Sequence, residues 1–377
     1  MLCNIFIFLF CIWFLMPELV VDSVSKSYGS IRALRNVSFR VGDGEYFCIL
    51  GPTGAGKTTL LKVISGLIRP DKGRVIIDGV DVTDFPPEVR NVSYMPQGYA
   101  LFPHMTVWDN VAYGAGMKGL PEEKVADALK LVGLYHRRDS YPHELSGGQQ
   151  QRIALARALA AGSKLLLLDE PLSALDILLN IELRYELKNL CRELDLTVLH
   201  VTHNVEEAMS IADRMMVLRK GVVQQIGSPR EVYMNPANLF VANFLSEVNF
   251  IEGILRGIRL GLGVIETDKL GVIHVYTRPV RFWHVVVAYR PEDIVLSVDP
   301  PPTDLNVFRG RVVEREFIGI VTRFLVDVNG VEMHVNVWTS VAPDVKVDDY
   351  VYVHLPPRYG LIYPYPREGL MKAIAVE

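Results

Sequence analysis

Apolar and polar positions follow two different patterns along this chain of 377 residues, and the change falls near residue 243. Before it, short apolar runs at 45–50, 164–168 and 197–202 are typical of buried strands. Between these runs the apolar residues recur with helical spacing, most clearly at Glu122–Val132 and Gln149–Ala161. Because strands and helices alternate, we predict an α/β fold with a parallel sheet flanked by helices.

Two smaller subdomains are expected within this first part. Apolar alternation at 18–24 and 37–41 predicts additional short strands. An Asp-Gly pair at 78–79 stands between the apolar runs of 74–82 and predicts a hairpin. These strands would form an antiparallel β subdomain. From about 88 to 162 the pattern is mainly helical and predicts a helical subdomain.

Strand periodicity replaces helical periodicity in the last third of the chain. Every second residue of 322–328 is apolar or a threonine, and alternation returns at 331–337. Proline clusters at 300–302 and 356–357 interrupt the runs. The pattern predicts a separate all-β domain over 244–377, a small barrel, after a first domain over 16–243.

The first fifteen residues are almost wholly apolar and uncharged, unlike the rest of the chain. A membrane-spanning helix needs about 20 apolar residues, and a secretory signal has a basic start and a small-residue cleavage site. This segment has neither that length nor those features. Met16 directly precedes the first expected strand, so we expect translation to begin there and residues 1–15 to be an artefact of the assigned gene start. A short membrane-associating tail is the alternative.

Composition excludes some classes of partner and site. Half of the residues are hydrophobic and 22% are charged, which is ordinary for a protein with a packed core. The formal net charge of −4 argues against nucleic acid as the main partner, since binding a phosphate backbone usually needs a basic face. The cysteines form no C-x-x-C pair and have no zinc or disulfide spacing. They are Cys3, Cys11, Cys48 and Cys191.

A glycine-rich segment follows the first buried strand and precedes a helix expected from Lys57 to about Ser65. It matches the phosphate-binding pattern G-x-x-x-x-G-K-[ST] in full and has the strand–loop–helix context that the pattern requires. Its backbone N–H groups and the helix start would cradle phosphate oxygens. Lys57 would reach the β and γ phosphates, and the Thr58 hydroxyl would bind Mg²⁺. We expect ATP to be bound by Gly51, Pro52, Thr53, Gly54, Ala55, Gly56, Lys57, Thr58 and Thr59.

Two carboxylates, Asp169 and Glu170, end the second buried strand. An Asp-Glu pair at a strand end is common by itself, but downstream of a phosphate loop it is typical of nucleotide hydrolysis. We expect Asp169 to hold Mg²⁺, directly or through water. Glu170 would polarise the attacking water as a general base.

A third motif, Leu-Ser-Gly-Gly-Gln at 145–149, opens the helix that continues through Arg152. This helix start offers a second anion site, which makes sense if it closes over the ATP of a partner subunit. The motif resembles the signature of ABC (ATP-binding cassette) ATPases, and the resemblance implies a head-to-tail pair with shared ATP sites. The residues expected at the partner's ATP are Ser146, Gly147, Gly148 and Gln149.

The resemblance to ABC ATPases implies roles for further residues. Tyr28 matches the aromatic residue that stacks on adenine. Gln97 matches the glutamine that senses Mg²⁺ and the attacking water, in the loop that meets the membrane subunit. Asp176 belongs to the loop that crosses the dimer interface, and His203 matches the switch histidine that contacts the γ-phosphate. Asn204 departs from the family, where an acidic residue is common.

Transport is favoured over the other activities of ABC ATPases by the organisation of the chain. DNA-repair members insert a long coiled coil between phosphate loop and signature, and translation members carry two cassettes; this sequence has neither. We therefore expect an ATPase subunit at the cytoplasmic face of the membrane, working as a homodimer or with a second ATPase. Its partners would be two permease subunits and an extracytoplasmic substrate-binding protein. A soluble ABC ATPase outside transport is the less favoured alternative.

The transported substrate is the least determined feature. The segments 226–236 and 289–294 resemble importers of the maltose, polyamine, iron and molybdate type, the second matching a motif of their C-terminal TOBE (oligonucleotide-fold-like) domain. The segments 84–87 and 99–107 look most similar to molybdate/tungstate importers, although neighbouring importers share much of them. Since the ATPase subunit does not bind the cargo, we expect oxyanion import and keep sugar, polyamine and iron import as alternatives.

Overall fold

The computed structural model describes residues 19–173 and 175–376. The expectation about the translation start concerns residues 1–15 and so lies outside the described residues. The chain divides into two compact units between Asn235 and Pro236. This division falls a few residues before the boundary expected at 243.

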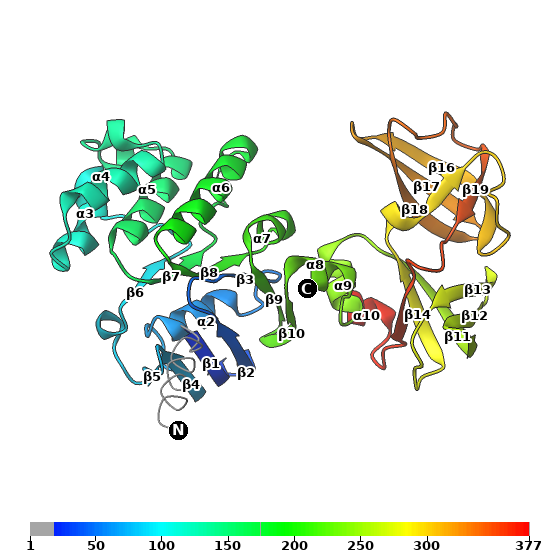
Figure 1. Cartoon of the computed structure of the whole chain (residues 1–377), viewed down its shortest axis with the longest axis horizontal. Coiled ribbons are helices and arrows are strands. Elements are labelled where there is room, and N and C mark those ends of the chain that lie inside the picture. The colour runs from blue at the N-terminus through cyan, green and yellow to red at the C-terminus, as the bar shows by residue number, and fades with distance from the viewer. Residues whose placement is uncertain (1–18, 174, 377) are drawn as a thin grey trace, which may run out of the picture. The chain divides into compact units, whose positions relative to one another are not determined.

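A six-stranded sheet forms the centre of the first unit (Figure 1). Its strands are β3 (Tyr46–Leu50), β6 (Val92–Met95), β7 (Leu165–Asp169), β8 (Thr197–Thr202), β9 (Arg214–Arg219) and β10 (Val222–Gly227). They lie in the order β10-β9-β3-β8-β7-β6, all parallel except β10, which pairs antiparallel with β9 at the edge. β3, β7 and β8 are buried along their whole length, as their apolar runs predicted.

An antiparallel sheet packs against the central sheet. Its strands are β1 (Leu19–Tyr28), β2 (Ile31–Val41), β4 (Lys72–Ile77) and β5 (Val80–Asp81), in the order β2-β1-β4-β5. Asp78 and Gly79 of the predicted hairpin have φ angles of 50° and 77°, the left-handed pair that a tight two-residue turn requires. Phe39 stacks on Phe47 of β3 with ring centroids 5.4 Å apart, so the two sheets share one core.

The helices of the first unit complete the α/β fold predicted from the sequence. They are α2 (Lys57–Ile64), α3 (Val107–Met117), α4 (Glu122–Leu131), α5 (Gly147–Ala160), α6 (Ile177–Glu193), α7 (Val205–Ile211) and α8 (Pro229–Met234). Leu60 and Leu61 of α2 are fully buried in the core shared by the two sheets. α3, α4 and α5 pack on one another and form a helical subdomain, drawn in cyan and green in Figure 1.

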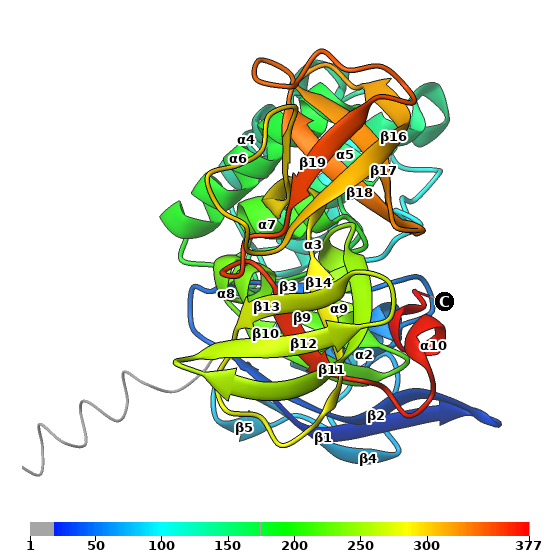
Figure 2. The same cartoon turned by 90° about the vertical axis from the view of Figure 1, so that its right-hand side faces the viewer.

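The second unit contains two five-stranded antiparallel sheets (Figure 2). The first, in the order β13-β12-β11-β14-β20, consists of β11 (Asn249–Arg259), β12 (Leu262–Thr267), β13 (Gly271–Tyr276), β14 (His284–Tyr289) and β20 (Leu361–Pro364). The second, in the order β15-β19-β16-β17-β18, consists of β15 (Val295–Ser297), β16 (Val307–Phe317), β17 (Val321–Val328), β18 (Val331–Trp338) and β19 (Tyr350–His354). Side chains from both sheets enclose one core, so the predicted barrel-like β domain is confirmed.

Two short helices in the second unit were not predicted. They are α9 (Leu239–Leu245) and α10 (Leu370–Ile374). Leu239 and Ala242 of α9 pack with Val286 of β14 and Tyr363 of β20, which explains why the second unit begins before residue 243. Among the described helices, none combines the length and the apolar character needed to cross a membrane.

Candidate functional site

The glycine-rich loop joins the buried strand β3 to α2, as the sequence predicted. Two of its glycines have no room for a side chain. A Cβ atom on Gly51 would clash with the carbonyl oxygen of Leu218, and one on Gly56 with that of Ala33. Gly56 also has a φ of 102°, which other residues rarely adopt. The loop therefore needs glycine at both positions, because there it lies directly against the backbones of β9 and β2.

Lys57 begins α2 and is almost fully buried, with 6% of its surface exposed. Its ammonium group donates hydrogen bonds to the carbonyl oxygens of Gly51 (2.8 Å) and Pro52 (2.9 Å). Burial lowers the pKa of this lysine, and the nearby carboxylates of Glu170 and Asp169 oppose that shift. The cation is thus held inside the glycine-rich loop.

Asp169 and Thr58 meet at the end of β7. The Thr58 hydroxyl donates a hydrogen bond to Asp169 Oδ1 (3.2 Å). The other oxygen, Oδ2, is buried and makes no hydrogen bond of good geometry within the described residues. Burial raises the pKa of Asp169, against the hydrogen bond from Thr58 and the charge of Lys57.

A carboxylate oxygen beside a hydroxyl is a set of hard donors that suits Mg²⁺, so the residues fit the expected ion. The described part of the chain contains no cluster of three or more His, Cys, Asp or Glu side chains able to hold a metal. An Mg²⁺ that takes part in phosphoryl transfer is bound partly by the phosphates of the nucleotide. Asp169 and Thr58 would therefore supply only some of its ligands.

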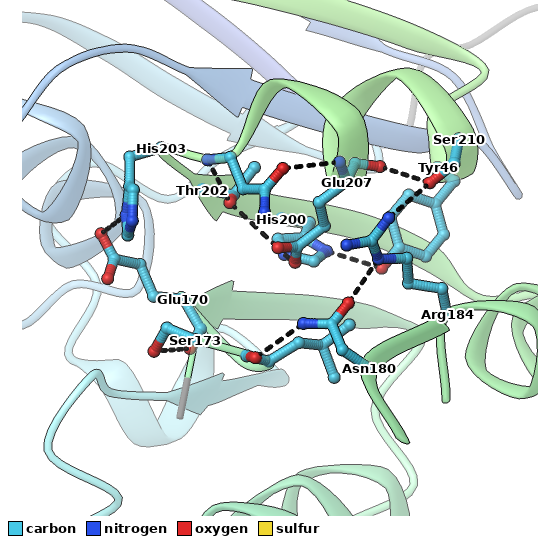
Figure 3. Close-up of polar contacts among 12 residues, drawn as sticks. Tyr46, Glu170, Ser173, Asn180, Arg184, His200, Thr202, His203, Glu207 and Ser210 are labelled. Carbon is cyan, nitrogen blue, oxygen red and sulfur yellow. Dashed lines mark hydrogen bonds and ion pairs between the residues drawn. The ribbon is translucent and has the colours of Figure 1, made fainter. Parts of the chain in front are cut away.

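Glu170 follows Asp169 with a φ of 50°, a left-handed conformation that is rare outside glycine. Backbone contacts hold it there: its N–H donates to the carbonyl oxygen of Val201 (2.9 Å), and its carbonyl oxygen accepts from Gln151 Nε2 (2.8 Å). The side chain lies between two groups. Gln97 Nε2 donates to Oε2 (2.9 Å), and His203 Nδ1 lies 3.0 Å from Oε1 (Figure 3).

One open cavity of about 670 Å³ brings most of the predicted residues together. Its volume lies in the range of small-ligand sites. The wall lies at the carboxyl ends of the parallel strands, where α/β sheets bind ligands. The predicted residues in this wall are Tyr28, Thr53, Gly54, Gly56, Lys57, Thr58, Thr59, Gln97, Glu170 and His203. Gly51, Pro52 and Ala55 belong to the same loop but lie outside the wall.

Tyr28 stands at the rim of the cavity with 46% of its surface exposed. The chain before it is anchored by Asp71, whose carboxylate accepts hydrogen bonds from Lys26 Nζ (2.8 Å) and from the Ser27 N–H (2.7 Å). These two hydrogen bonds, the one from Lys26 first, lower the pKa of Asp71. An anchored strand end thus presents the aromatic ring to the cavity.

Several polar residues of the site were not predicted from the sequence. Arg32, Arg35 and Lys220 line the same cavity and add positive charge, which suits a phosphate ligand. Gln151 is fully buried and supports the backbone of Glu170. Of these residues, only Gln151 could have been identified from the sequence, because it is a polar residue on the buried face of an amphipathic helix.

The signature segment begins α5 outside the cavity wall. Ser146 and Gln149 form a reciprocal cap: the Ser146 N–H donates to Gln149 Oε1 (2.9 Å), and the Gln149 N–H donates to Ser146 Oγ (3.4 Å). A Cβ atom added to Gly147 would meet nothing within 4 Å. Gly148 follows in the first turn of the helix. None of these four residues lines the cavity described above.

Asp176 is also outside the cavity wall. Its side chain caps α6 by accepting a hydrogen bond from the Leu179 N–H (3.0 Å). Residue 174 of the same loop lies outside the described residues. For Asp176 and for the signature residues, a role at the ATP of a second subunit stays a prediction.

Comparison with known proteins decides the family. The chain is 43% identical to the molybdate/tungstate import ATP-binding protein WtpC of Pyrococcus abyssi, over 83% of this chain and 90% of the relative. It is 42% identical to the spermidine/putrescine import ATP-binding protein PotA of Aggregatibacter actinomycetemcomitans, over 82% of this chain and 85% of the relative. The ABC transporter family model matches residues 34–173. The chain belongs to the ABC transporter ATP-binding family. The resemblance drawn from the motifs is therefore confirmed, and the chain is an ATP-binding ABC-type ATPase.

Both units of this ABC protein have counterparts. A TOBE domain model matches residues 287–362 in the second unit. The first unit is similar to the bacterial ABC transporter cassette MJ0796, solved as a dimer, with a TM-score of 0.53 and 32% identity. That match covers 56% of this chain and 99% of the cassette. The same cassette was also solved as a dimer in a post-hydrolysis state bound to ADP and Pi, with the same TM-score.

Proposed function

We propose that this chain is the ATP-hydrolysing subunit of an ABC import complex and that ATP with Mg²⁺ occupies the cavity between Tyr28 and Glu170. The observation that carries the proposal is the position of the Glu170 carboxylate. It lies between Gln97 and His203, in a cavity whose wall includes the phosphate-binding loop. A carboxylate, an amide and an imidazole around one point suit the orientation of a water that attacks a phosphate.

Each side chain then has a distinct task. The adenine stacks on the exposed ring of Tyr28, and the phosphates lie on the loop that ends at Lys57. Lys57 exchanges its two carbonyl partners for the β and γ phosphates. Thr58, Asp169 and Gln97 would hold Mg²⁺, which supplies positive charge against the phosphates. Glu170 takes a proton from the attacking water, and His203 contacts the γ-phosphate.

The active form is a head-to-tail homodimer in this proposal. The start of α5 is a helix N-terminus, which attracts anions, and space is open around Gly147. A second subunit would present its ATP there, and Asp176 would lie in the interface between the two. Support comes from the similar cassette MJ0796, whose solved structures are dimers.

Import is supported by the names of the relatives. WtpC is an import ATP-binding protein for molybdate/tungstate, and PotA is one for spermidine/putrescine. We favour the oxyanions as cargo and retain polyamines as the second candidate. The complex would include two permease subunits and an extracytoplasmic binding protein, with this chain at the cytoplasmic face of the membrane.

Reconstitution tests this proposal. The chain is assembled in proteoliposomes with the permease and the binding protein encoded beside its gene, and uptake of tungstate and of spermidine is measured. We expect ATP-dependent tungstate uptake that Lys57→Ala abolishes. Uptake of spermidine alone would move the assignment to polyamines, and hydrolysis without uptake of any cargo would contradict the role in import.

A further inference from the structure

Buried polar side chains lie behind the loop that carries His203 (Figure 3). Glu207 of α7 is 3% exposed, and His200 of β8 is completely buried. His200 Nε2 lies 2.8 Å from Glu207 Oε1, and the Tyr46 hydroxyl lies 2.8 Å from His200 Nδ1. None of these three residues lines the cavity. A carboxylate is costly to bury unless it is paired, so its presence here calls for a role.

Glu207 is held in its charged form. Burial by itself raises its pKa, but His200 above all, then Arg184 and the Thr202 hydroxyl, bring the pKa below its ordinary value. His200 Nε2 is the ring nitrogen that faces this carboxylate. The Tyr46 hydroxyl holds the other side of the ring, and burial raises the pKa of Tyr46 well above its ordinary value.

Three hydrogen bonds join Glu207 and the two residues that flank His203. The Thr202 hydroxyl donates to Glu207 Oε2 (3.2 Å) and accepts from the Asn204 N–H (3.0 Å). Asn204 Oδ1 in turn accepts from the Glu207 N–H (3.0 Å), which caps α7. His203 is the residue between Thr202 and Asn204. The backbone of His203 therefore lies in a turn that is held to Glu207 at two points, the carboxylate through Thr202 and the backbone N–H through Asn204.

Further contacts tie α7 to the segment that follows Glu170. Asn180 Nδ2 donates to the carbonyl oxygen of Leu172 (2.8 Å), and Asn180 Oδ1 accepts from Arg184 Nε. Arg184 Nη1 lies 3.5 Å from Ser210 Oγ on α7. A connected set of polar contacts thus links the segment after Glu170 to the helix that follows His203 (Figure 3).

We propose that Glu207 is a positioning residue for ATP hydrolysis, which acts by fixing the turn of Thr202, His203 and Asn204 so that the imidazole faces Glu170. This inference rests on the proposed function, because it takes His203 to act at the γ-phosphate. Since Glu207 lies outside the cavity wall, removing its charge leaves nucleotide binding intact. Hydrolysis falls because the imidazole is no longer held in one direction.

Steady-state hydrolysis by the full-length protein gives the first test. Glu207→Gln keeps the size of the side chain and removes its charge. We expect kcat to fall about tenfold, the effect of weakening one hydrogen bond to a charged group, with the KM for ATP changed less than about twofold. The matched control is Glu206→Gln, the exposed neighbour on the same helix, which keeps the kcat of the wild type.

A double-mutant cycle separates positioning from a general structural effect. If Glu207 acts through His203, then Glu207→Gln causes no further loss in the His203→Ala background. The same fold-loss in both backgrounds, or a wild-type kcat for Glu207→Gln alone, overturns the inference. Thr202→Val, which removes only the hydroxyl between Glu207 and Asn204, carries the same test if Glu207→Gln unfolds. An inactive wild type contradicts the proposed function instead.

Discussion

His203 Nδ1 lies 3.0 Å from Glu170 Oε1, and Gln97 Nε2 holds the other oxygen of the same carboxylate at 2.9 Å. A general base needs an oxygen directed at the water that it activates. Both oxygens of Glu170 are here engaged by side chains of its own subunit. Hydrolysis therefore requires one of these contacts to give way to water. His203 has 55% of its side chain exposed, so its imidazole is open to a phosphate in the cavity while the turn from Thr202 to Asn204 holds its backbone.

His203→Ala should lower the rate of ATP hydrolysis about 10²-fold, the usual effect of removing one group that stabilises developing charge. Its affinity for ATP should stay close to that of the wild type, because the rest of the cavity wall is unchanged. Turnover assays and equilibrium binding measure the two quantities. The exposed His136 offers a control, since His136→Ala should leave both unchanged. A kcat for His203→Ala within twofold of the wild type would remove this residue from the mechanism.

Gly147→Ala should separate folding from activity. The added methyl group meets nothing within 4 Å of its own subunit, so the melting temperature should stay within about 2 °C of the wild type. In the proposed dimer the methyl group would stand beside the partner's ATP, so hydrolysis should fall at least about tenfold while each subunit still binds ATP. Full activity in this variant would argue against a composite site at α5.

Tyr28→Ala should weaken ATP binding about tenfold, because stacking of a base on an aromatic ring contributes roughly 1–3 kcal/mol. The ring is half exposed, so the fold should not change. Tyr28→Phe keeps the ring and should bind ATP like the wild type. Equal affinities for the alanine and phenylalanine variants would show that adenine does not stack here.

Asp71→Asn should lower the melting temperature at pH 7. In acid, the difference in melting temperature between this variant and the wild type should disappear. The pKa of Asp71 is lower in the folded protein, first because of Lys26 and then because of the Ser27 N–H. Such a carboxyl stabilises the fold above its unfolded-state pKa, near 3.8, and loses that contribution as the pH falls through its folded-state pKa. Melting curves from pH 7 to about 3 measure the effect, with the exposed Asp43→Asn as control. A difference that does not narrow below about pH 4 would contradict this account of Asp71.

The sequence predicts the parts of the site in which chemistry dictates residue type and order. Gly51, Lys57, Asp169 and Glu170 lie at or just after apolar runs that are typical of buried strands, so their places at the strand ends could be predicted. The convergence of Lys57 and Glu170 on one cavity then follows from a parallel sheet.

The supporting contacts could not be predicted in the same way. His200 sits within an apolar run and looks there like any strand residue; its partners Tyr46 and Glu207 come from another strand and a helix. Only the three-dimensional pairing of β3 with β8 brings them together. The short helices α9 and α10 owe their form to packing on the β domain, which local sequence does not report.

Glu170→Gln tests the central claim most directly, since it removes the proposed general base and keeps the size of the side chain. Steady-state hydrolysis and equilibrium ATP binding are measured on the full-length protein, with Glu206→Gln as control. We predict ATP binding close to that of the wild type and a kcat at least about 10²-fold lower. Hydrolysis by Glu170→Gln at the wild-type rate would contradict the role given to this carboxylate and the account built on it.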